Sequence, residues 1–227
     1  MNTWTKLGIA EIPNNGGQLT LSQRDQEFSI RLSGIRGELM NSRVHNSEEA
    51  LAELGCAHLS NTANARVLVG GLGMGFTLAA TLLAVAGSAK VIVAELIPEV
   101  VEWNRGPLGE CAGNPLSDPR VKVHQGDVAL CLASKTPHYD AILLDVDNGP
   151  EGITQSDNDW LYTPQGLEDI FKTLRPKGML AIWSAADDPK FVTRLKKARF
   201  AVTTKTVRAR VGKGSRHTIF LAQKPGR

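Results

Sequence analysis

Short apolar runs alternate with longer mixed stretches over most of the chain. Each run is rich in β-branched residues and is bounded by turn residues, which is typical of a strand. Strands are therefore expected over residues 66–70, 90–96, 121–127, 139–146 and 179–184. The near-continuous apolar run of residues 139–146, YDAILLDV, predicts a strand that is buried on both faces.

The stretches between these runs have the spacing of helices. Helices are expected after Gly75, over residues 98–106, over residues 128–134, from Thr163 to a stop before Pro176, and over residues 188–199. Strand and helix in regular alternation predict a parallel sheet with helices on both faces. The expected fold class is thus α/β, a doubly wound, mostly parallel, Rossmann-like sheet.

Both ends of the chain have a β pattern instead. The first 37 residues alternate as strands do, with a hairpin turn at NNGG, residues 14–17. A helix is expected from Ser47, which we take as its N-cap. Residues 200–224 predict a C-terminal antiparallel hairpin. We therefore divide the chain into a small β-rich segment, residues 1–46, and a larger domain, residues 47–227.

Composition narrows the class of protein. The chain has 227 residues, 42% hydrophobic and 22% charged, which is ordinary globular composition. It has no apolar run long enough to span a bilayer and no signal-peptide core, so we expect a cytoplasmic protein without a membrane partner. The scattered Cys56, Cys111 and Cys131 suggest neither a disulfide framework nor a metal site. Basic residues gather after Lys190, but the net charge of +3 is too small to predict a nucleic-acid partner, which stays open only for the basic hairpin.

A cluster of glycines stands where the first buried strand turns into a helix. GGLGMG, residues 70–75, contains G-x-G-x-G at Gly71, Gly73 and Gly75. Side chains at such a turn would keep a nucleoside away from the backbone. A nicotinamide dinucleotide prefers G-x-G-x-x-G, and Phe76 stands at the position of its third glycine. The tighter pattern favours an adenosyl sulfonium cofactor, which has no phosphate.

Acidic residues follow the next strands at the edge where the ligand crevice of such a sheet lies. Glu95 ends one strand, and its carboxylate has the geometry to bind both ribose hydroxyls. Asp127 ends the next and is either a receptor for the exocyclic amine of adenine or a helix N-cap. Asp145 ends the strand after that. The glycine turn and these three acids, in this order along the chain, predict a nucleoside pocket.

Taken together, RVLVGGLGMG, KVIVAELIPEVVEWNR, DPRVKVHQGDV and YDAILLDVDNGP resemble the spermidine synthase family, within the class I S-adenosylmethionine methyltransferase fold. The resemblance covers roughly residues 66–184. It implies an S-adenosylmethionine or decarboxylated S-adenosylmethionine cofactor, bound by Gly71, Gly73, Met74, Gly75, Glu95, Leu96, Asp127, Val128 and Asp145. It also implies that Asp145 lies beside the sulfonium and the attacking amine, and that the protein is a homodimer.

The chain departs from the family pattern at three places. Leu72 and Met74 interrupt the G-G-G-D-G-G turn, so the acid that recognises the aminopropyl amine is missing. D-S-S-D-P becomes DVDNGP, in which Asp147 follows Asp145 by two residues instead of three. RVHNSEEA stands in place of the diamine-gripping Y-H-E segment, and its imperfect substitutes are His45, Glu48 and Glu49.

The expected chemistry is an in-line displacement at a sulfonium carbon. Asp145 would orient an amine acceptor and take its proton, and Asp147 would assist. Trp160, Tyr162 and Trp183 either flank the acceptor or pack in the core.

Three functions follow from these residues. We favour a methyltransferase that acts on an amine or other small nucleophile, because the aminopropyl-recognising acid is missing. The alternatives are an aminopropyltransferase of the spermidine synthase type and a non-catalytic nucleoside-binding protein.

Overall fold

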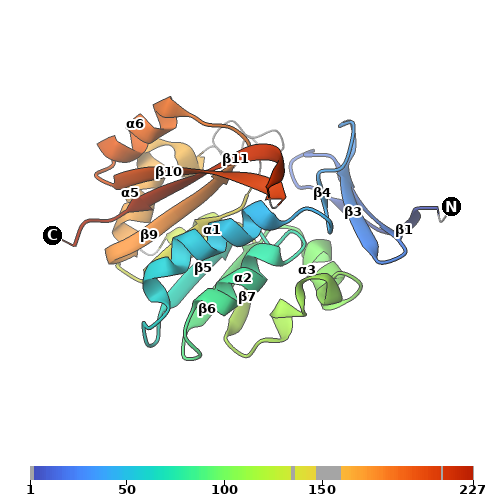
Figure 1. Cartoon of the computed structure of the whole chain (residues 1–227), viewed down its shortest axis with the longest axis horizontal. Coiled ribbons are helices and arrows are strands. Elements are labelled where there is room, and N and C mark those ends of the chain that lie inside the picture. The colour runs from blue at the N-terminus through green and yellow to red at the C-terminus, as the bar shows by residue number, and fades with distance from the viewer. Residues whose placement is uncertain (1–2, 134–135, 147–159, 211, 227) are drawn as a thin grey trace.

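The computed structural model describes residues 3–133, 136–146, 160–210 and 212–226, and it contains two sheets (Figure 1). The smaller sheet is antiparallel and N-terminal. Its strands are β1 (Thr5–Glu11), β2 (Gln18–Arg24), β3 (Glu27–Leu32) and β4 (Met40–Asn41), in that order. The expected β character of the first residues is confirmed. The long segment after the first turn forms two strands because the chain reverses at Asp25, whose φ is 54°.

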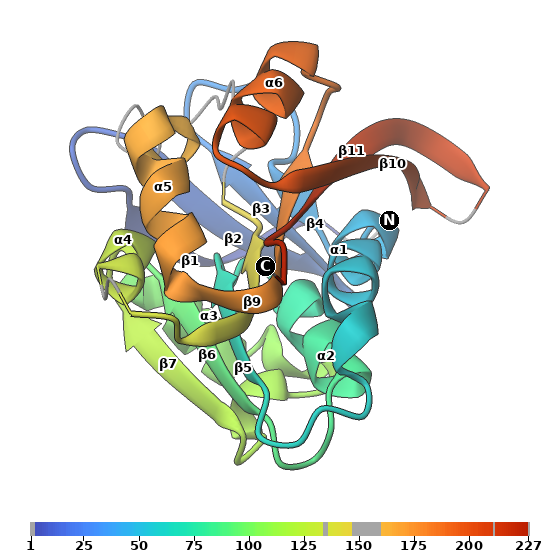
Figure 2. The same ribbon diagram turned by 90° about the vertical axis from the view of Figure 1, so that its left-hand side faces the viewer.

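The larger sheet has seven strands in the order β10-β11-β9-β8-β5-β6-β7. Its parallel strands are β5 (Arg66–Gly70), β6 (Lys90–Glu95), β7 (Val121–Gln125), β8 (Tyr139–Leu144) and β9 (Leu174–Ser184). The strands β10 (Ala201–Arg210) and β11 (Lys213–Gln223) form the hairpin, and β11 pairs antiparallel with β9. The doubly wound, mostly parallel fold with an antiparallel C-terminal edge is thus confirmed. Figure 2 shows the tip of this hairpin extending beyond the helices.

Helices cover both faces of this sheet (Figures 1 and 2). One face carries α1 (Asn46–Cys56), α2 (Phe76–Ala84) and α3 (Pro98–Arg105), and the other carries α4 (Val128–Leu132), α5 (Pro164–Thr173) and α6 (Pro189–Lys197). Short 3-10 turns occur at η1 (Ala57–Leu59), η2 (Gly109–Ala112) and η3 (Pro115–Ser117). Two hydrophobic clusters, one on each face, form the core.

Two predicted boundaries are wrong. Ser47 is not the N-cap of α1, because the helix begins at Asn46 and His45 occupies the cap position; Ser47 lies buried in the first turn. The helix after Thr163 ends at Thr173, before Pro176 as expected, but the following strand begins at Leu174 and not at Met179. Leu174 turns to an extended conformation, is fully buried and pairs with Tyr139, so β9 begins there.

The N-terminal sheet packs against the larger domain and shares the first hydrophobic cluster with it. Leu21 and Ile30 of this sheet are fully buried in that cluster, together with residues of α1, α2 and α3. On β1, Gly8 lies so close to Trp103 of α3 that a Cβ atom there would come within 2.6 Å of the indole nitrogen. The predicted division at residues 46 and 47 therefore separates two sheets that share one core.

Within the described residues, every helix is too short or too polar to cross a membrane.

Candidate active site

The centre of the large sheet is the point where the strand order reverses. The chain runs outward from β5 to β6 and β7, and then returns to place β8 on the other side of β5. The glycine turn after β5 and Asp145 after β8 are therefore neighbours at the carboxyl edge. The amide of Asp145 donates to the carbonyl oxygen of Gly70 at 2.8 Å. Ligands of doubly wound sheets bind at such a switch point.

The glycines of the turn are required first by the protein's own backbone. Gly71, Gly73 and Gly75 have φ angles of 89°, 52° and 86°, in the left-handed region that favours glycine. A Cβ atom at Gly71 would overlap the backbone carbonyl of Asp145, and one at Gly75 would lie 2.9 Å from the side-chain oxygen of Asn104. Asn104 also donates to the carbonyl of Gly73 at 2.8 Å, so α3 holds the turn in place.

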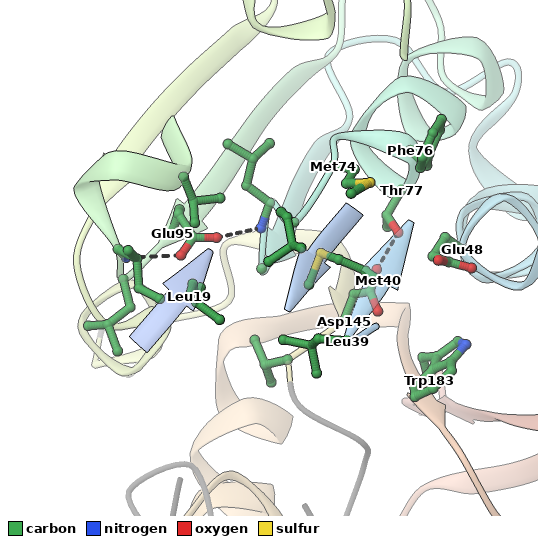
Figure 3. Close-up of a pocket in the computed structure, with 18 of the residues that line it drawn as sticks. Leu19, Leu39, Met40, Glu48, Met74, Phe76, Thr77, Glu95, Asp145 and Trp183 are labelled. Atoms are coloured by element: carbon green, nitrogen blue, oxygen red, sulfur yellow. Dashed lines mark hydrogen bonds between the residues drawn. The ribbon is translucent and has the colours of Figure 1, made fainter. Parts of the chain in front are cut away.

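A cavity of about 420 Å³ opens beside this turn, within the range of small-molecule sites. Its floor is the glycine turn and the ends of the strands, and apolar side chains of the N-terminal sheet, among them Leu19 and Met40, form the opposite wall (Figure 3). In that view Glu95 lies toward one end, Glu48 and Trp183 toward the other, and Asp145 between them. Of the expected cofactor-binding residues, the cavity is lined by Gly71, Gly73, Met74, Glu95, Leu96, Asp127, Val128 and Asp145. Gly75 is not among the lining residues and instead begins α2.

Glu95 is buried, 8% exposed, at the end of β6. Burial raises the pKa of its carboxyl, and backbone amides that donate to it oppose that shift. One oxygen accepts from the amide of Leu72 and the other from the amide of Ile97, both at 2.9 Å. The backbone amides of Gly73 and Leu96 also stabilise its ionised form. Glu95 thus also ties the glycine turn to the end of the neighbouring strand.

Asp127 is the N-cap of α4, as one of the two sequence interpretations expected. Its Oδ1 accepts from the amide of Ala129 at 2.8 Å. Asp127 also lines the cavity together with Val128 and Leu96. The cap does not exclude the second interpretation, since a carboxylate accepts several hydrogen bonds at once.

Asp145 is held by Thr77 in the first turn of α2. The hydroxyl of Thr77 donates to Oδ2 of Asp145 at 2.5 Å (Figure 3). Burial and the negative charge of Glu48 raise the pKa of Asp145 to about 7, and the Thr77 hydrogen bond opposes this shift. A carboxylate with this pKa exchanges a proton near neutral pH, which suits a general base.

Glu48 approaches Asp145 from a different part of the chain. It lies in the first turn of α1 and lines the cavity, and the hydroxyl of Ser47 donates to its Oε2 at 2.6 Å. Burial raises the pKa of Glu48, and the charge of Glu49 adds to this effect. The neighbouring Glu49 faces His45 instead, at 2.9 Å from its Nδ1.

Trp183 and His217 form the wall beyond Asp145. Their rings lie 4.7 Å apart, and burial lowers the pKa of His217, so the imidazole is neutral near pH 7. Within the described chain, Trp183 Nε1 and His217 Nδ1 are buried without a hydrogen-bond partner. His217 Nε2 lies 2.8 Å from the hydroxyl of Ser215. Buried polar atoms of this kind are normally paired, which leaves room for a polar ligand.

The other candidates lie away from the cavity or outside the described residues. Tyr162 packs edge-to-face on Phe191 in the second cluster, and Trp160 packs at the border of that cluster. His45 stacks on Phe76 with ring centroids 4.3 Å apart. Asp147, the second expected catalytic acid, lies outside the described residues.

The cavity has a pronounced charge asymmetry. Its described lining contains the carboxylates of Glu48, Glu95, Asp127 and Asp145, and it contains neither lysine nor arginine. Among the described residues, none of these four carboxylates makes an ion pair, and they accept hydrogen bonds from hydroxyl groups and backbone amides. The site is therefore built for a ligand that carries positive charge. Nowhere in the described chain do three or more His, Cys, Asp or Glu side chains gather to hold a metal ion.

Three groups of site residues had no clear signal in the sequence. The apolar wall comes from the N-terminal sheet. Alternation in the sequence shows which of its positions face inward, but it does not show that they face this cavity. Thr77 is an ordinary helix residue until the structure brings it to Asp145. His217 reaches the site from the C-terminal hairpin, whose sequence shows only a concentration of basic residues.

Comparisons with known proteins agree with this architecture. A search of the curated proteins finds no match. Among solved structures, the chain is similar to a spermidine synthase from Thermotoga maritima, with a TM-score of 0.74 and 17% identity over 98% of this chain and 73% of that one. It is equally similar to a spermidine synthase in complex with the transition-state analogue AdoDATO, with a TM-score of 0.74 and 18% identity over the same shares of the two chains. The family model of the spermine/spermidine synthase domain matches residues 45–206. The chain therefore belongs to the spermine/spermidine synthase family of transferase enzymes.

Proposed function

We propose that this protein transfers an aminopropyl group from decarboxylated S-adenosylmethionine to an amine acceptor. The observation that carries the proposal is the charge of the cavity, whose described lining has four carboxylates and no lysine or arginine. Decarboxylated S-adenosylmethionine carries a sulfonium and an ammonium but no carboxylate. Its charge complements this lining, whereas the carboxylate of S-adenosylmethionine would meet no cationic side chain there. The family membership supports the same choice over the methyl transfer that the sequence favoured.

The nucleoside half of the donor would lie between Glu95 and α4. Glu95 would accept hydrogen bonds from the ribose hydroxyls, and Asp127 with Val128 would border the adenine. This orientation directs the sulfonium toward the glycine turn and Asp145, which lies between Glu95 and the Trp183 wall (Figure 3). The ribose hydroxyls would then lie at the Glu95 end of the cavity, and the positively charged part of the donor would lie toward Asp145.

The reaction needs an acceptor nitrogen with a free lone pair, aligned with a carbon that the sulfonium already activates. Asp145 would accept a hydrogen bond from the acceptor ammonium and take its proton, which its pKa of about 7 allows near neutral pH. A C–N bond forms as the C–S bond breaks, and neutral methylthioadenosine leaves. Trp183 would contact the acceptor's carbon chain, and the unpaired Nδ1 of neutral His217 would accept from it.

Methyl transfer stays the second candidate because of Met74. This side chain is buried and lines the cavity next to Gly73, which stands where the family's glycine turn has its amine-recognising acid. An apolar thioether there gives no support to an ammonium, and it leaves room for a donor with a different tail.

The product identifies the reaction. The purified protein would be incubated with either donor and a panel of primary amines that includes 1,3-diaminopropane, putrescine and cadaverine. Aminopropyl transfer releases methylthioadenosine, whereas methyl transfer releases S-adenosylhomocysteine, and chromatography separates the two. We expect methylthioadenosine with the decarboxylated donor, and its loss in Asp145→Asn. S-adenosylhomocysteine alone would establish the second candidate, and no turnover with either donor would contradict both.

A further inference from the structure

Glu48 and Asp145 present an unusual electrostatic situation. Both side chains line the same cavity, and burial raises the pKa of both carboxyl groups. The negative charge of Glu48 raises the pKa of Asp145 further. In the described part of the chain, neither carboxylate makes an ion pair with lysine, arginine or histidine. Two like charges in a partly dry site are unfavourable unless a cation accompanies them. In the ligand-free site a proton on Asp145 relieves this repulsion, and a cationic ligand would relieve it in the complex.

The proposed reaction brings two ammonium groups to this region, one on the acceptor and one at the end of the donor's aminopropyl chain. Asp145 accounts for the acceptor, because it ends β8 next to the glycine turn and has the pKa of a proton acceptor. The donor's ammonium then needs a carboxylate of its own. The glycine turn does not supply one, since Gly73 stands at the position of the missing acid and the side chain of the neighbouring Met74 is apolar.

Glu48 is the carboxylate that fits this need. It lies beyond Thr77 and Asp145, on the side away from Glu95 (Figure 3). That side is where the donor's chain extends beyond the sulfonium when the ribose is at Glu95. The hydroxyl of Ser47 donates to Oε2 of Glu48 at 2.6 Å, which fixes the carboxylate before any ligand arrives.

We propose that Glu48 of α1 binds the primary ammonium of the aminopropyl donor, and so performs from a helix the recognition that the missing acid performs from the glycine turn. This assignment rests on the proposed function. It makes Glu48 the residue that selects the decarboxylated donor, because the same carboxylate would repel the carboxylate of S-adenosylmethionine.

The test compares two ligands that share a nucleoside but differ in the ammonium. Decarboxylated S-adenosylmethionine and neutral methylthioadenosine would be titrated by calorimetry, without acceptor, into the wild type and Glu48→Gln. We expect the variant to lose affinity for the decarboxylated donor by about 10- to 100-fold, the scale of one hydrogen bond to a charged group. Affinity for methylthioadenosine should stay within about 2-fold, which also reports that the variant is folded and its nucleoside pocket intact.

Glu49→Gln is the matched control. Glu49 is the next residue on the same helix, but it faces His45 and does not line the cavity. Its substitution removes a carboxylate from the same helix turn without removing a group that lines the cavity, so it measures the long-range part of the effect. We expect its affinity for both ligands to stay within about 2-fold of the wild type.

Three outcomes would overturn the assignment, and they differ from one another. An equal loss for both ligands in Glu48→Gln would make Glu48 a structural residue. An unchanged affinity for the donor with a raised KM for the amine would give Glu48 to the acceptor. If the wild type itself bound the decarboxylated donor no better than methylthioadenosine, the proposed function would fail together with the assignment.

Discussion

Thr77 lies in the first turn of α2, directly after the glycine turn, and its hydroxyl donates to Oδ2 of Asp145, which follows β8, at 2.5 Å. Thr77 is 2% exposed, so water does not compete for this hydrogen bond. It stabilises the ionised form of Asp145, against burial and the charge of Glu48, which both favour the protonated form. The working state of the site therefore depends on the balance of these three contributions.

Substitution of Thr77 by valine should move the acid limb of the pH–rate profile toward higher pH. The variant keeps the shape of the side chain and loses the hydrogen bond that lowers the pKa of Asp145. At pH 7 we expect kcat/KM for methylthioadenosine release to fall about 3- to 10-fold, and to recover at pH 9. Thr81→Val is the control, because Thr81 is buried on the same helix and donates only to the backbone of Thr77. A uniform loss at every pH would contradict the prediction.

Glu48→Gln should move the same limb in the opposite direction. Removal of the Glu48 charge eliminates a contribution that raises the pKa of Asp145. More of Asp145 is then ionised below pH 7, and the profile of kcat, measured at saturating donor, should extend to lower pH. A profile that keeps its wild-type midpoint would show that the two carboxylates do not interact.

Asp145→Asn should stabilise the ligand-free protein at alkaline pH. The pKa of Asp145 is raised in the fold from 3.8 to about 7, so the folded state holds the proton more tightly than the unfolded state. This stabilising contribution is complete below about pH 4 and is lost as the pH rises through 7. In urea unfolding at pH 8, we expect the variant to exceed the wild type by about 1–3 kcal/mol. The gap should narrow at pH 5, and a gap independent of pH would disprove this account.

The glycines of the turn should differ in their tolerance of alanine. At Gly71 a methyl group would overlap the carbonyl of Asp145, which is backbone and cannot move aside. At Gly73 the nearest atom is the sulfur of Met40, 3.4 Å away on a flexible side chain. We expect Gly73→Ala to cost about 1 kcal/mol, the strain of the left-handed conformation alone, and Gly71→Ala to cost several-fold more in urea unfolding. An equal loss of unfolding free energy in the two variants would mean that the backbone of Asp145 can move away from Gly71.

An acid restored to the glycine turn should compensate for the loss of Glu48. In the double variant Glu48→Gln with Met74→Asp, a carboxylate again lines the cavity, now from the glycine turn, one residue after the position that the family uses. We expect calorimetry to show at least a 5-fold recovery of affinity for the decarboxylated donor over Glu48→Gln alone. Methylthioadenosine should bind the single and double variants alike, since it has no ammonium to respond.

Local sequence signals were sufficient for the framework of the site. The order of strands and helices, the glycine turn and the acids Glu95, Asp127 and Asp145 at strand ends follow from patterns within a few residues. Parallel strands align their carboxyl ends, so such acids meet at one edge without further information. For Asp127 the sequence offered a helix cap and a ligand-binding role as alternatives, and the structure shows a helix cap that also lines the cavity.

The remaining features depend on contacts between distant segments. Ser47 has the residue type of an N-cap, but α1 begins one residue earlier and Ser47 binds Glu48 instead. The charge on Asp145 is controlled by Thr77 and Glu48, which lie about 70 and 100 positions away in the sequence. No periodicity encodes such a meeting, because it is set by the packing of α1 and α2 over the sheet.

The contact between Gly8 and Trp103 has a consequence for the order in which the protein is made. The N-terminal sheet is synthesised before the larger domain, and the α3 surface that buries β1 follows some 60 residues after β4 ends. Until then the apolar side chains of Leu21 and Ile30, which the finished structure buries fully, have no partner from the larger domain and stay in contact with water. The wall that closes the cavity is thus synthesised before the domain that it covers, and it reaches its final place only when that domain has formed.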